Sequence, residues 1–389
     1  MNQAVNRWSV RTLAVGLLGV AGLAQIPAAA AASYQLQTLS GVGYGADMNN
    51  AGLVVGGSGS LYGGRPVSWL AGTTTFLPQT SQTLVASATG VSQNGFVVGG
   101  LAPLFGGESA VRWQGDTYTL LNPKAPAVGA YATAVNNSGV AVGWAEADPL
   151  YGFAAAAIWN ADGSPGLLND LTRNGASAAY DINNDGLVVG SSLVSLPGAD
   201  FGIGWRAVQW SQGVPTALQS PGAGTYDVAR GISESGLIVG ASRNAARYDT
   251  AALWIGASDL AFNLGTLPGD DSSWANAVNR SGQAVGSSYQ YFNQDNTPNR
   301  AVLWDGFVAT DLNLFLSPEQ VQAGWKLYDA TSINDAGAIL VNGLNIVSNE
   351  YQAFLLTPVP EPGTWALFLS GLAGVALAKK RRMGTHTAP

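Results

Sequence analysis

Short apolar segments alternate with polar, glycine-containing turns along most of the chain, and this alternation recurs as a unit. The unit reads Ala-x-x-Val/Ile-Asn/Ser-x-x-Gly-x-x-Val-Gly and is clearest at residues 132–143. Apolar runs of about four to six residues bounded by Asn, Ser and Gly predict short β-strands joined by tight turns. The seven turn glycines lie 43 to 55 residues apart: Gly52, Gly95, Gly139, Gly186, Gly236, Gly282 and Gly337.

Each repeat predicts one four-stranded blade. The small residues before the turn suit a crowded innermost strand, and the Asn or Ser of the turn bonds forward to backbone N–H groups while Gly accepts positive φ. A third apolar run closes with a Trp, which we interpret as packing between blades: Trp69, Trp113, Trp159, Trp210, Trp254 and Trp304, with Leu356 in the seventh repeat. Repeats of about 45 residues built from short strands are typical of a propeller, so we predict an all-β, seven-bladed β-propeller.

The two ends of the repeat region predict how the ring closes. The seventh repeat runs from Ala330 to Leu356 and lacks a fourth strand, whereas residues 34–39 form a strand that belongs to no repeat. If the N-terminal strand joins the last blade, both unpaired edges disappear. We therefore expect a propeller over residues 33–357, closed by its N-terminal strand; a ring of six or eight blades or an incomplete ring is the alternative.

Residues 1–32 have the pattern of a secretory signal peptide. Arg7 and Arg11 precede an apolar stretch from Leu13 to Ile26, and Ala30–Ala32 offers a small-residue cleavage site. An uncleaved membrane anchor is the alternative. The pattern favours export of the chain.

The C-terminal region, residues 358–382, combines three parts in order. They are Val359-Pro360-Glu361-Pro362, an apolar stretch from Thr364 to Ala378, and the basic cluster Lys379, Lys380, Arg381 and Arg382. The apolar stretch would span roughly 22 Å as a helix, less than the ~30 Å core of a bilayer. This region resembles the PEP-CTERM sorting signal of Gram-negative bacteria. The resemblance implies an exosortase as partner, transient anchoring in the inner membrane and delivery to the cell envelope or the extracellular space; residues 383–389 are an additional tail.

The repeat phrase itself resembles the HAF family of extracellular repeats, from about Gly45 to Leu356. That resemblance implies an exported repeat protein and carries no established activity. No cofactor is expected.

Composition excludes several kinds of chemistry. There is no Cys, and the one histidine, His386, lies in the tail. Ser–His and Cys–His catalysis and a zinc site are therefore not expected, and we predict no metal site. Without the two terminal signals the net charge is about −12, which disfavours binding to nucleic acid.

Aromatic residues just ahead of the innermost strands mark a candidate binding face around the channel mouth. With two neighbouring carboxylates they form the candidate ligand site: Tyr44, Tyr131, Tyr226, Trp274, Tyr328, Asp227 and Asp329. Aromatic rings offer a surface on which sugar C–H groups stack, and carboxylates accept sugar hydroxyls. The alternative is that these rings plug the channel and bind nothing.

The sequence thus favours an exported, non-enzymatic propeller that binds a glycan, such as an exopolysaccharide, or a surface protein. A polysaccharide-cleaving propeller that uses Asp or Glu is one alternative. A structural matrix protein without a discrete site is the other.

Overall fold

The computed structural model describes residues 33–359 except 60–63, 80–82, 104–106, 124–126, 128, 147–153, 173–175, 197–198, 200–201, 257–260 and 292–297. The chain divides into two units, 1–32 and 33–389. The predicted signal peptide and all of the sorting region after Val359 lie outside the described residues.

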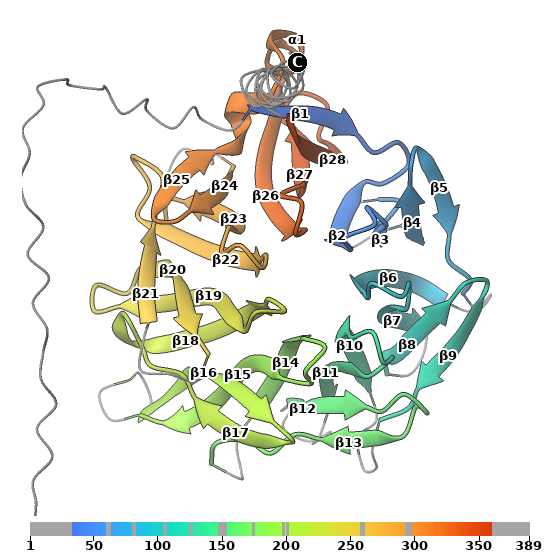
Figure 1. The fold of residues 1–389 in the computed structure, drawn as a ribbon, viewed down its shortest axis with the longest axis vertical. Coiled ribbons are helices and arrows are strands. Elements are labelled where there is room, and N and C mark those ends of the chain that lie inside the picture. Colours follow the sequence, from blue (N-terminus) through green and yellow to red (C-terminus); the bar gives the residue numbers. More distant parts are fainter. Residues whose placement is uncertain are drawn as a thin grey trace, which may run out of the picture. The chain divides into compact units, whose positions relative to one another are not determined.

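The described part is a ring of seven four-stranded antiparallel sheets, as predicted (Figure 1). The innermost strands are β2 (Tyr44–Met48), β6 (Thr83–Val91), β10 (Ala130–Val135), β14 (Ser177–Ile182), β18 (Ala223–Ile232), β22 (Ser272–Val278) and β26 (Trp325–Ile333). The second strands are β3 (Val54–Gly57), β7 (Val97–Pro103), β11 (Ala141–Glu146), β15 (Val188–Ser195), β19 (Leu237–Asn244), β23 (Ala284–Tyr289) and β27 (Ile339–Asn345).

The third strands are β4 (Pro66–Leu70), β8 (Ser109–Gln114), β12 (Ala154–Trp159), β16 (Ile203–Ser211), β20 (Asp249–Ile255), β24 (Arg300–Asp305) and β28 (Glu350–Val359). The outermost strands are β5 (Thr73–Phe76), β9 (Thr117–Leu121), β13 (Pro165–Leu167), β17 (Val214–Ala217), β21 (Ala261–Gly265), β25 (Val308–Asp311) and β1 (Ser33–Thr38). We number the blades 1 to 7 from β2 to β26. One parallel pair, Trp205 with Tyr226, links blades 4 and 5.

Ring closure occurs as the sequence predicts. The last blade has the order β1-β28-β27-β26, and Ser33 to Thr38 pair with Val359 to Phe354 (Figure 1). Asn342 strengthens the junction between blades 7 and 1, because its amide both accepts from the Gly45 N–H (2.8 Å) and donates to the Gly45 carbonyl (2.9 Å).

The core lies between neighbouring blades. Trp113, Trp159, Trp210, Trp254 and Trp304 are fully buried, which confirms their predicted packing role. Each shares a core cluster with a leucine at or just after the end of the outermost strand of the preceding blade, such as Leu121 beside Trp159. The indole Nε1 of Trp159 also donates to the Asn122 carbonyl at 2.9 Å. Trp113, Trp210 and Trp254 each make the equivalent bond to a carbonyl just after the outermost strand of the preceding blade. The Trp therefore joins blades both by apolar burial and by a hydrogen bond.

One insertion is not predicted by the repeat pattern. Between β25 and β26 lie a short 3-10 helix, η2 (Leu312–Phe315), and α1 (Pro318–Gln322). Ser317 and Gln320 form a capping box at the start of α1.

Candidate functional site

The central channel has two mouths of different construction. At the turn mouth the Asn/Ser-x-x-Gly turns of all seven blades meet. At the loop mouth the innermost strands begin, and the loops between strands 2 and 3 and between blades emerge. Each mouth is built from residues that recur in the repeat.

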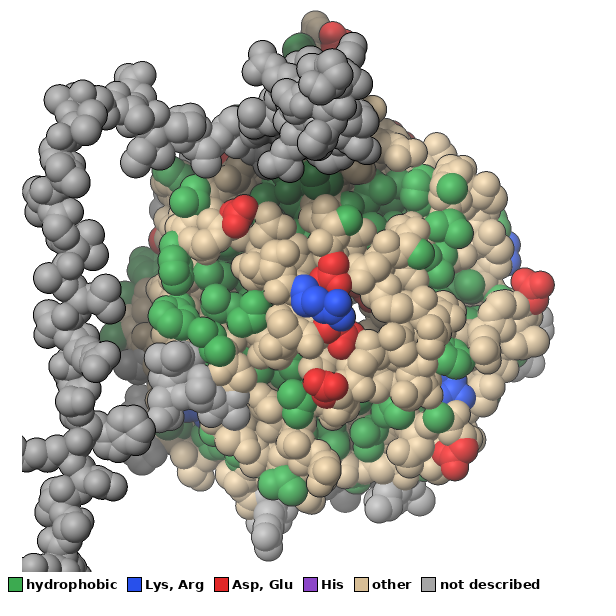
Figure 2. All heavy atoms as spheres, viewed as in Figure 1, with side chains coloured by type: hydrophobic (Ala, Val, Ile, Leu, Met, Phe, Trp, Pro, Cys, Tyr) green, Lys and Arg blue, Asp and Glu red, His purple; other side chains and the backbone are tan. Residues whose placement is uncertain are grey.

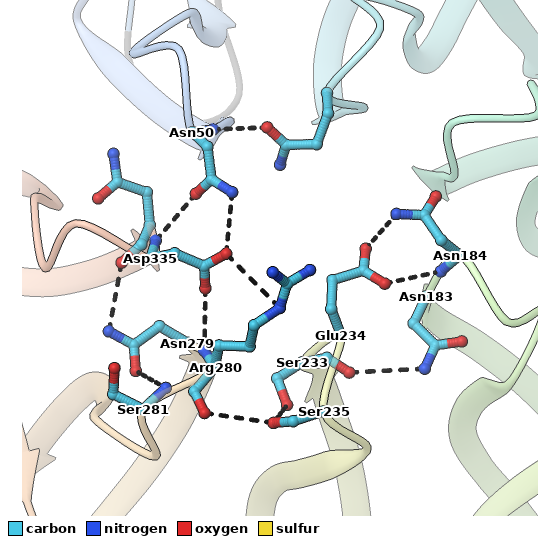
Figure 3. Close-up of polar contacts among 12 residues, drawn as sticks. Asn50, Asn183, Asn184, Ser233, Glu234, Ser235, Asn279, Arg280, Ser281 and Asp335 are labelled. Atoms are coloured by element: carbon cyan, nitrogen blue, oxygen red, sulfur yellow. Dashed lines mark hydrogen bonds and ion pairs between the residues drawn. The ribbon is translucent and has the colours of Figure 1, made fainter.

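The turn mouth is a closed polar structure (Figure 3). The turn Asn or Ser is buried in every blade. Its side chain accepts from backbone N–H groups of its own turn, as Asn334 does from Ala336 (3.1 Å) and Ala338 (2.9 Å). In four blades the amide also donates to the next blade, as Asn49 does to the Ser92 carbonyl (3.0 Å).

The residue after each turn Asn or Ser continues this pattern around the channel. Its N–H donates to the side-chain oxygen of the same residue in the next blade, at 2.8 to 3.1 Å. We call these residues the polar ring: Asn50, Gln93, Asn137, Asn184, Glu234, Arg280 and Asp335. The ring is interrupted once, because the guanidinium of Arg280 has no acceptor for the Glu234 N–H. Figure 3 shows Arg280 pointing between Glu234 and Asp335, with its Nε 3.9 Å from the Asp335 carboxylate.

Two carboxylates lie directly behind the polar ring. Asp181 accepts from the N–H groups of Ile182 and, on the next blade, Ile232, both at 2.8 Å. Burial is the main cause that raises the pKa of Asp181 to about 7. Asp47 bridges blades 1 and 2 through the Val91 N–H (2.9 Å), and burial raises its pKa as well. The hollow that these groups line measures only 140 Å³. On this face, Figure 2 shows a small cluster of basic and acidic side chains at the centre of the ring.

Every innermost strand has a β-bulge along the channel, between the turn mouth and the loop mouth. One residue of each innermost strand drops out of register with the second strand: Ala46, Thr89, Thr133, Tyr180, Arg230, Asn276 and Thr331. In four blades the bulge side chain donates to a carbonyl of the next blade, as Thr89 does to Ala132 (2.7 Å). Tyr180 and Arg230 are too large for that contact and break the pattern. Both line the channel instead.

Two hollows of about 260 Å³ each open at the loop mouth and share three residues, Arg230, Asn276 and Asp329. Tyr44 and Tyr180 line one hollow; Trp274, Tyr289 and Tyr328 line the other. The structure thus brings together four of the predicted site residues, Tyr44, Trp274, Tyr328 and Asp329.

A hydrogen-bond relay crosses these hollows. Arg230 donates to Asn276 Oδ1 at 3.2 Å, and Asn276 Nδ2 donates to Asp329 Oδ1 at 2.8 Å. Burial raises the pKa of Asp329 to about 6, against the opposing effects of Arg230 and Asn276. Burial also raises the pKa values of Tyr44 and Tyr328, with Asp329 as the next cause for both. These tyrosines therefore stay protonated and can donate hydrogen bonds.

Several polar groups of the hollows have no partner in the part of the chain that the structure describes. They are the hydroxyls of Tyr44, Tyr180 and Tyr328 and the second carboxylate oxygen of Asp329. These residues are only partly buried, so the four groups remain accessible to a ligand, and their convergence in hollows is an arrangement typical of a ligand site.

Trp274 is already engaged by protein groups. Arg230 lies over its ring, 4.2 Å from guanidinium carbon to centroid, and its Nε1 donates to Tyr289 OH at 2.8 Å. Tyr226 packs against it at 6.0 Å between centroids and carries Arg243 over its own ring. Trp274 and Tyr226 therefore hold Arg230 and the blade 5 wall in position.

Tyr131 and Asp227 lie apart from the shared hollows. Tyr131 stacks on Trp144 with centroids 5.8 Å apart, and its hydroxyl lies 2.7 Å from Ser87 Oγ. Asp227 is fully buried, where it pairs with Arg206 (2.8 Å) and accepts from Ser220 and Ser242. The structure does not bring Asp227 together with the other candidate residues.

The five aromatic residues were predicted just ahead of the innermost strands and at equivalent points of their repeats. The structure places all five within these strands, and not all at equivalent positions. Tyr44, Tyr131 and Trp274 lie five residues before the turn Asn, whereas Tyr226 and Tyr328 lie seven and six residues before theirs. Additional register shifts, between Ala223 and Asp227 and between Leu327 and Asp329, absorb the difference.

The candidate site predicted from the sequence did not include Arg230, Asn276, Tyr180 and Tyr289. The first three have a signal in hindsight, because they occupy the position two residues before the last residue of an innermost segment, where other repeats have Ala or Thr. Among the described residues no group of three or more acidic, His or Cys side chains could hold a metal ion. None of the described helices is long and apolar enough to cross a membrane.

Comparison with known proteins identifies the C-terminal region. A family model described as the PEP-CTERM protein-sorting motif matches residues 358–382. The chain carries a PEP-CTERM sorting motif. This motif indicates export and sorting to the cell surface through an exosortase. Of the predicted signal residues only Val359 is among the described residues, as the last residue of β28.

No curated protein matches the chain. Among solved structures, the β-propeller domain of the Trilobed protease from Pyrococcus furiosus is 7% identical, with a TM-score of 0.48 and coverage of 82% of this chain and 98% of that one. A putative TolB from Agrobacterium tumefaciens is 13% identical, with a TM-score of 0.45 and coverage of 74% and 95%. A gluconolactonase from Xanthomonas campestris is 14% identical, with a TM-score of 0.38 and coverage of 77% and 91%.

Proposed function

We propose that this exported propeller binds a glycan at the loop mouth and does not cleave it. One observation carries the proposal: the two mouths differ in how their polar groups are satisfied. At the turn mouth nearly every polar side chain bonds to its counterpart in the next blade. At the loop mouth the hydroxyls of Tyr44 and Tyr328 and one carboxylate oxygen of Asp329, which have no partner among the described residues, converge on the two hollows.

The chemistry of this convergence suits a ligand rich in hydroxyl groups. Three phenolic hydroxyls can donate, while Asp329 accepts, and Arg230 adds donors on the same wall. The two amide hydrogens of Asn276 are already donated to Asp329 and Ala330, so Asn276 positions these groups. A flat protein surface would reach the rim residues but not the hollows, whereas a sugar unit or chain end fits their volume. This favours a glycan over a surface protein as the ligand.

The same residues favour binding over cleavage. A glycosidase needs two carboxyl groups on opposite sides of the scissile bond. Among the described residues that line the two hollows, Asp329 is the one carboxylate. The PEP-CTERM motif supports action at the cell surface, where polysaccharides are abundant.

A glycan array with the purified protein tests the proposal. Tyr44→Phe, Tyr328→Phe and Asp329→Asn should each weaken retention of the bound glycan about tenfold, because each removes one hydrogen-bonding group. Tyr118→Phe and Asp116→Asn are matched controls on and beside the outer strand β9 and should bind as the wild type does. Retention of no glycan, or release of new sugar ends during incubation, would contradict the proposal.

A further inference from the structure

The chain enters and leaves the ring at one point of blade 7. Ser33, the first residue after the predicted signal peptide, pairs with Val359, which directly precedes Pro360 of the sorting motif. β1 is the outermost strand of its sheet, so this pair lies at the outer edge of the blade. The two terminal signals are therefore attached to the ring at the same edge.

This edge point lies on the turn side of the ring. β28 starts at Glu350 on the loop side, where it pairs with the end of β27, and it ends at Val359. A Cβ at Gly337, the turn glycine of blade 7, would lie 3.3 Å from the Pro358 side chain. The ten residues of β28 thus run from the loop side to the turn side. At ~3.3 Å per residue this path is about 30 Å long.

The sequence leaves a short linker beyond this point. Residues 360–363 separate Val359 from Thr364, where the apolar stretch of the sorting motif begins. At ~3.5 Å per residue, Thr364 lies at most about 18 Å from Val359. If the loop side lay on a membrane, Val359 would stand about 30 Å above the lipid, beyond that reach. The linker therefore allows the turn side of the ring to touch the membrane and is too short for the loop side.

The turn side carries exposed apolar side chains on both neighbours of blade 7. On this side, the turn between the third and the outermost strand forms the corner of each blade. The corner of blade 6 has Phe307 and Val308, which are 63% and 68% exposed, and that of blade 1 has Leu70, which is 47% exposed. Val214 on blade 4 is similarly exposed but lies across the ring from blade 7 (Figure 1). The apolar corners of blades 6 and 1 thus flank the point where the chain leaves the ring.

We propose that, until the sorting signal is removed, the turn side of blades 6, 7 and 1 lies on a phospholipid surface and the loop mouth faces away from it. The apolar stretch 364–378 holds the chain in the bilayer, and the short linker prevents inversion of the ring. Phe307, Val308 and Leu70 enter the headgroup region, where apolar side chains of peripheral proteins are buried. The hollows of the loop mouth stay open in this position. The inference goes beyond the proposed function and does not depend on it.

The chain has no Cys, so single cysteines can report how close chosen positions lie to the lipid. The chain with its sorting signal, isolated from a host that lacks the exosortase, is placed in phosphatidylethanolamine–phosphatidylglycerol vesicles that contain a nitroxide-labelled lipid. A bimane fluorophore on Phe307→Cys or Leu70→Cys should be quenched at least twofold. The matched control is Ser348→Cys, an exposed position at the loop end of blade 7, where the emission should stay unchanged.

A second variant tests the reach of the linker. A Gly/Ser insertion of about 20 residues between Val359 and Pro360 adds roughly 25 Å of mean reach. It should reduce the quenching at Phe307→Cys and allow some at Ser348→Cys. Unchanged quenching would overturn the argument that the short linker orients the ring.

The other outcomes are equally decisive. Quenching at Ser348→Cys that equals or exceeds the quenching at Phe307→Cys would overturn the orientation. Absence of quenching at every position would show that the ring stands clear of the lipid and would also overturn it. None of these measurements involves a glycan, so their failure leaves the proposed function standing. A protein that retains no glycan can still show the predicted quenching.

Discussion

Replacement of Asn342 by glycine, the residue that blades 1 and 2 have at the equivalent position (Gly57 and Gly100), should destabilise the ring. In blade 7 the Asn342 side chain is fully buried. Its amide makes two hydrogen bonds to Gly45 across the closing junction.

The cost can be worked out from these contacts. Without the amide, the Gly45 N–H is left buried and unpaired, at about 1–3 kcal/mol, and the lost bond adds about 0.5–1.5 kcal/mol. The Gly45 carbonyl keeps Thr331 Oγ1 as a donor at 2.9 Å, so it adds little. We expect a loss of about 2–4 kcal/mol.

Chemical denaturation, with the midpoint and slope fitted together, measures this difference. Gly143→Asn is a contrasting variant, at a glycine whose Cβ would lie 2.0 Å from the Tyr131 carbonyl oxygen. It should be destabilised by about 3 kcal/mol or more, because its side chain meets backbone. An Asn342→Gly protein as stable as the wild type, or more stable, would refute the role of this amide in closure.

Three further predictions concern the ring and its processing, and a fourth concerns pH. Trp159→Ala should cost about 3–5 kcal/mol in chemical denaturation without changing glycan affinity; wild-type stability with lost binding would reverse the assigned role. Deletion of 34–39 should lower stability by several kcal/mol, since β28 loses its partner; unchanged thermal unfolding would reject closure by β1. Mass spectrometry of the secreted protein should show a C-terminus near Val359 to Pro362, and recovery of chains ending at Pro389 would contradict processing. The pKa of Asp181 is about 7 in the folded protein and exceeds its unfolded value, so the contribution of Asp181 to the free energy of unfolding should be largest at low pH and fall as pH rises from about 4 to about 7. In denaturation experiments at a series of pH values, Asp181→Asn should flatten that decline. An unchanged decline would exclude Asp181 as its cause.

The architecture could be predicted from sequence because it depends on local signals that recur. The turn glycines occur in all seven repeats and the closing Trp in six, and each has a physical reason that a single repeat already displays. Because the other six repeats predict a fourth strand, its absence after Leu356 pointed to closure by residues 34–39. The η2–α1 insertion interrupts the period, and its signal, Ser317 before Pro318 with Gln320 two residues later, is a helix start that a repeat pattern does not include.

The site was less predictable because its composition depends on contacts between blades. Asp227 looks like a free carboxylate in sequence, but Arg206, on the preceding blade, neutralises it. Trp274 looks like a stacking platform, but Arg230 already covers it. Neither partner is near in sequence, so only the folded ring shows which aromatic and acidic groups remain for a ligand.

A residue that departs from the repeat pattern can be interpreted only when the contacts that it fails to make are known. Arg280 departs from the polar ring and removes one acceptor, yet its guanidinium lies between Glu234 and Asp335 and its mouth holds only a 140 Å³ hollow (Figure 3). Arg230 departs from the bulge pattern and, with Tyr180, lines the channel, where the hollows together are larger and several polar groups have no partner among the described residues. An arginine in place of a small polar residue therefore fills the turn mouth, whereas at the loop mouth it adds hydrogen-bonding groups to the hollows. This difference is why we assign ligand binding to the loop mouth.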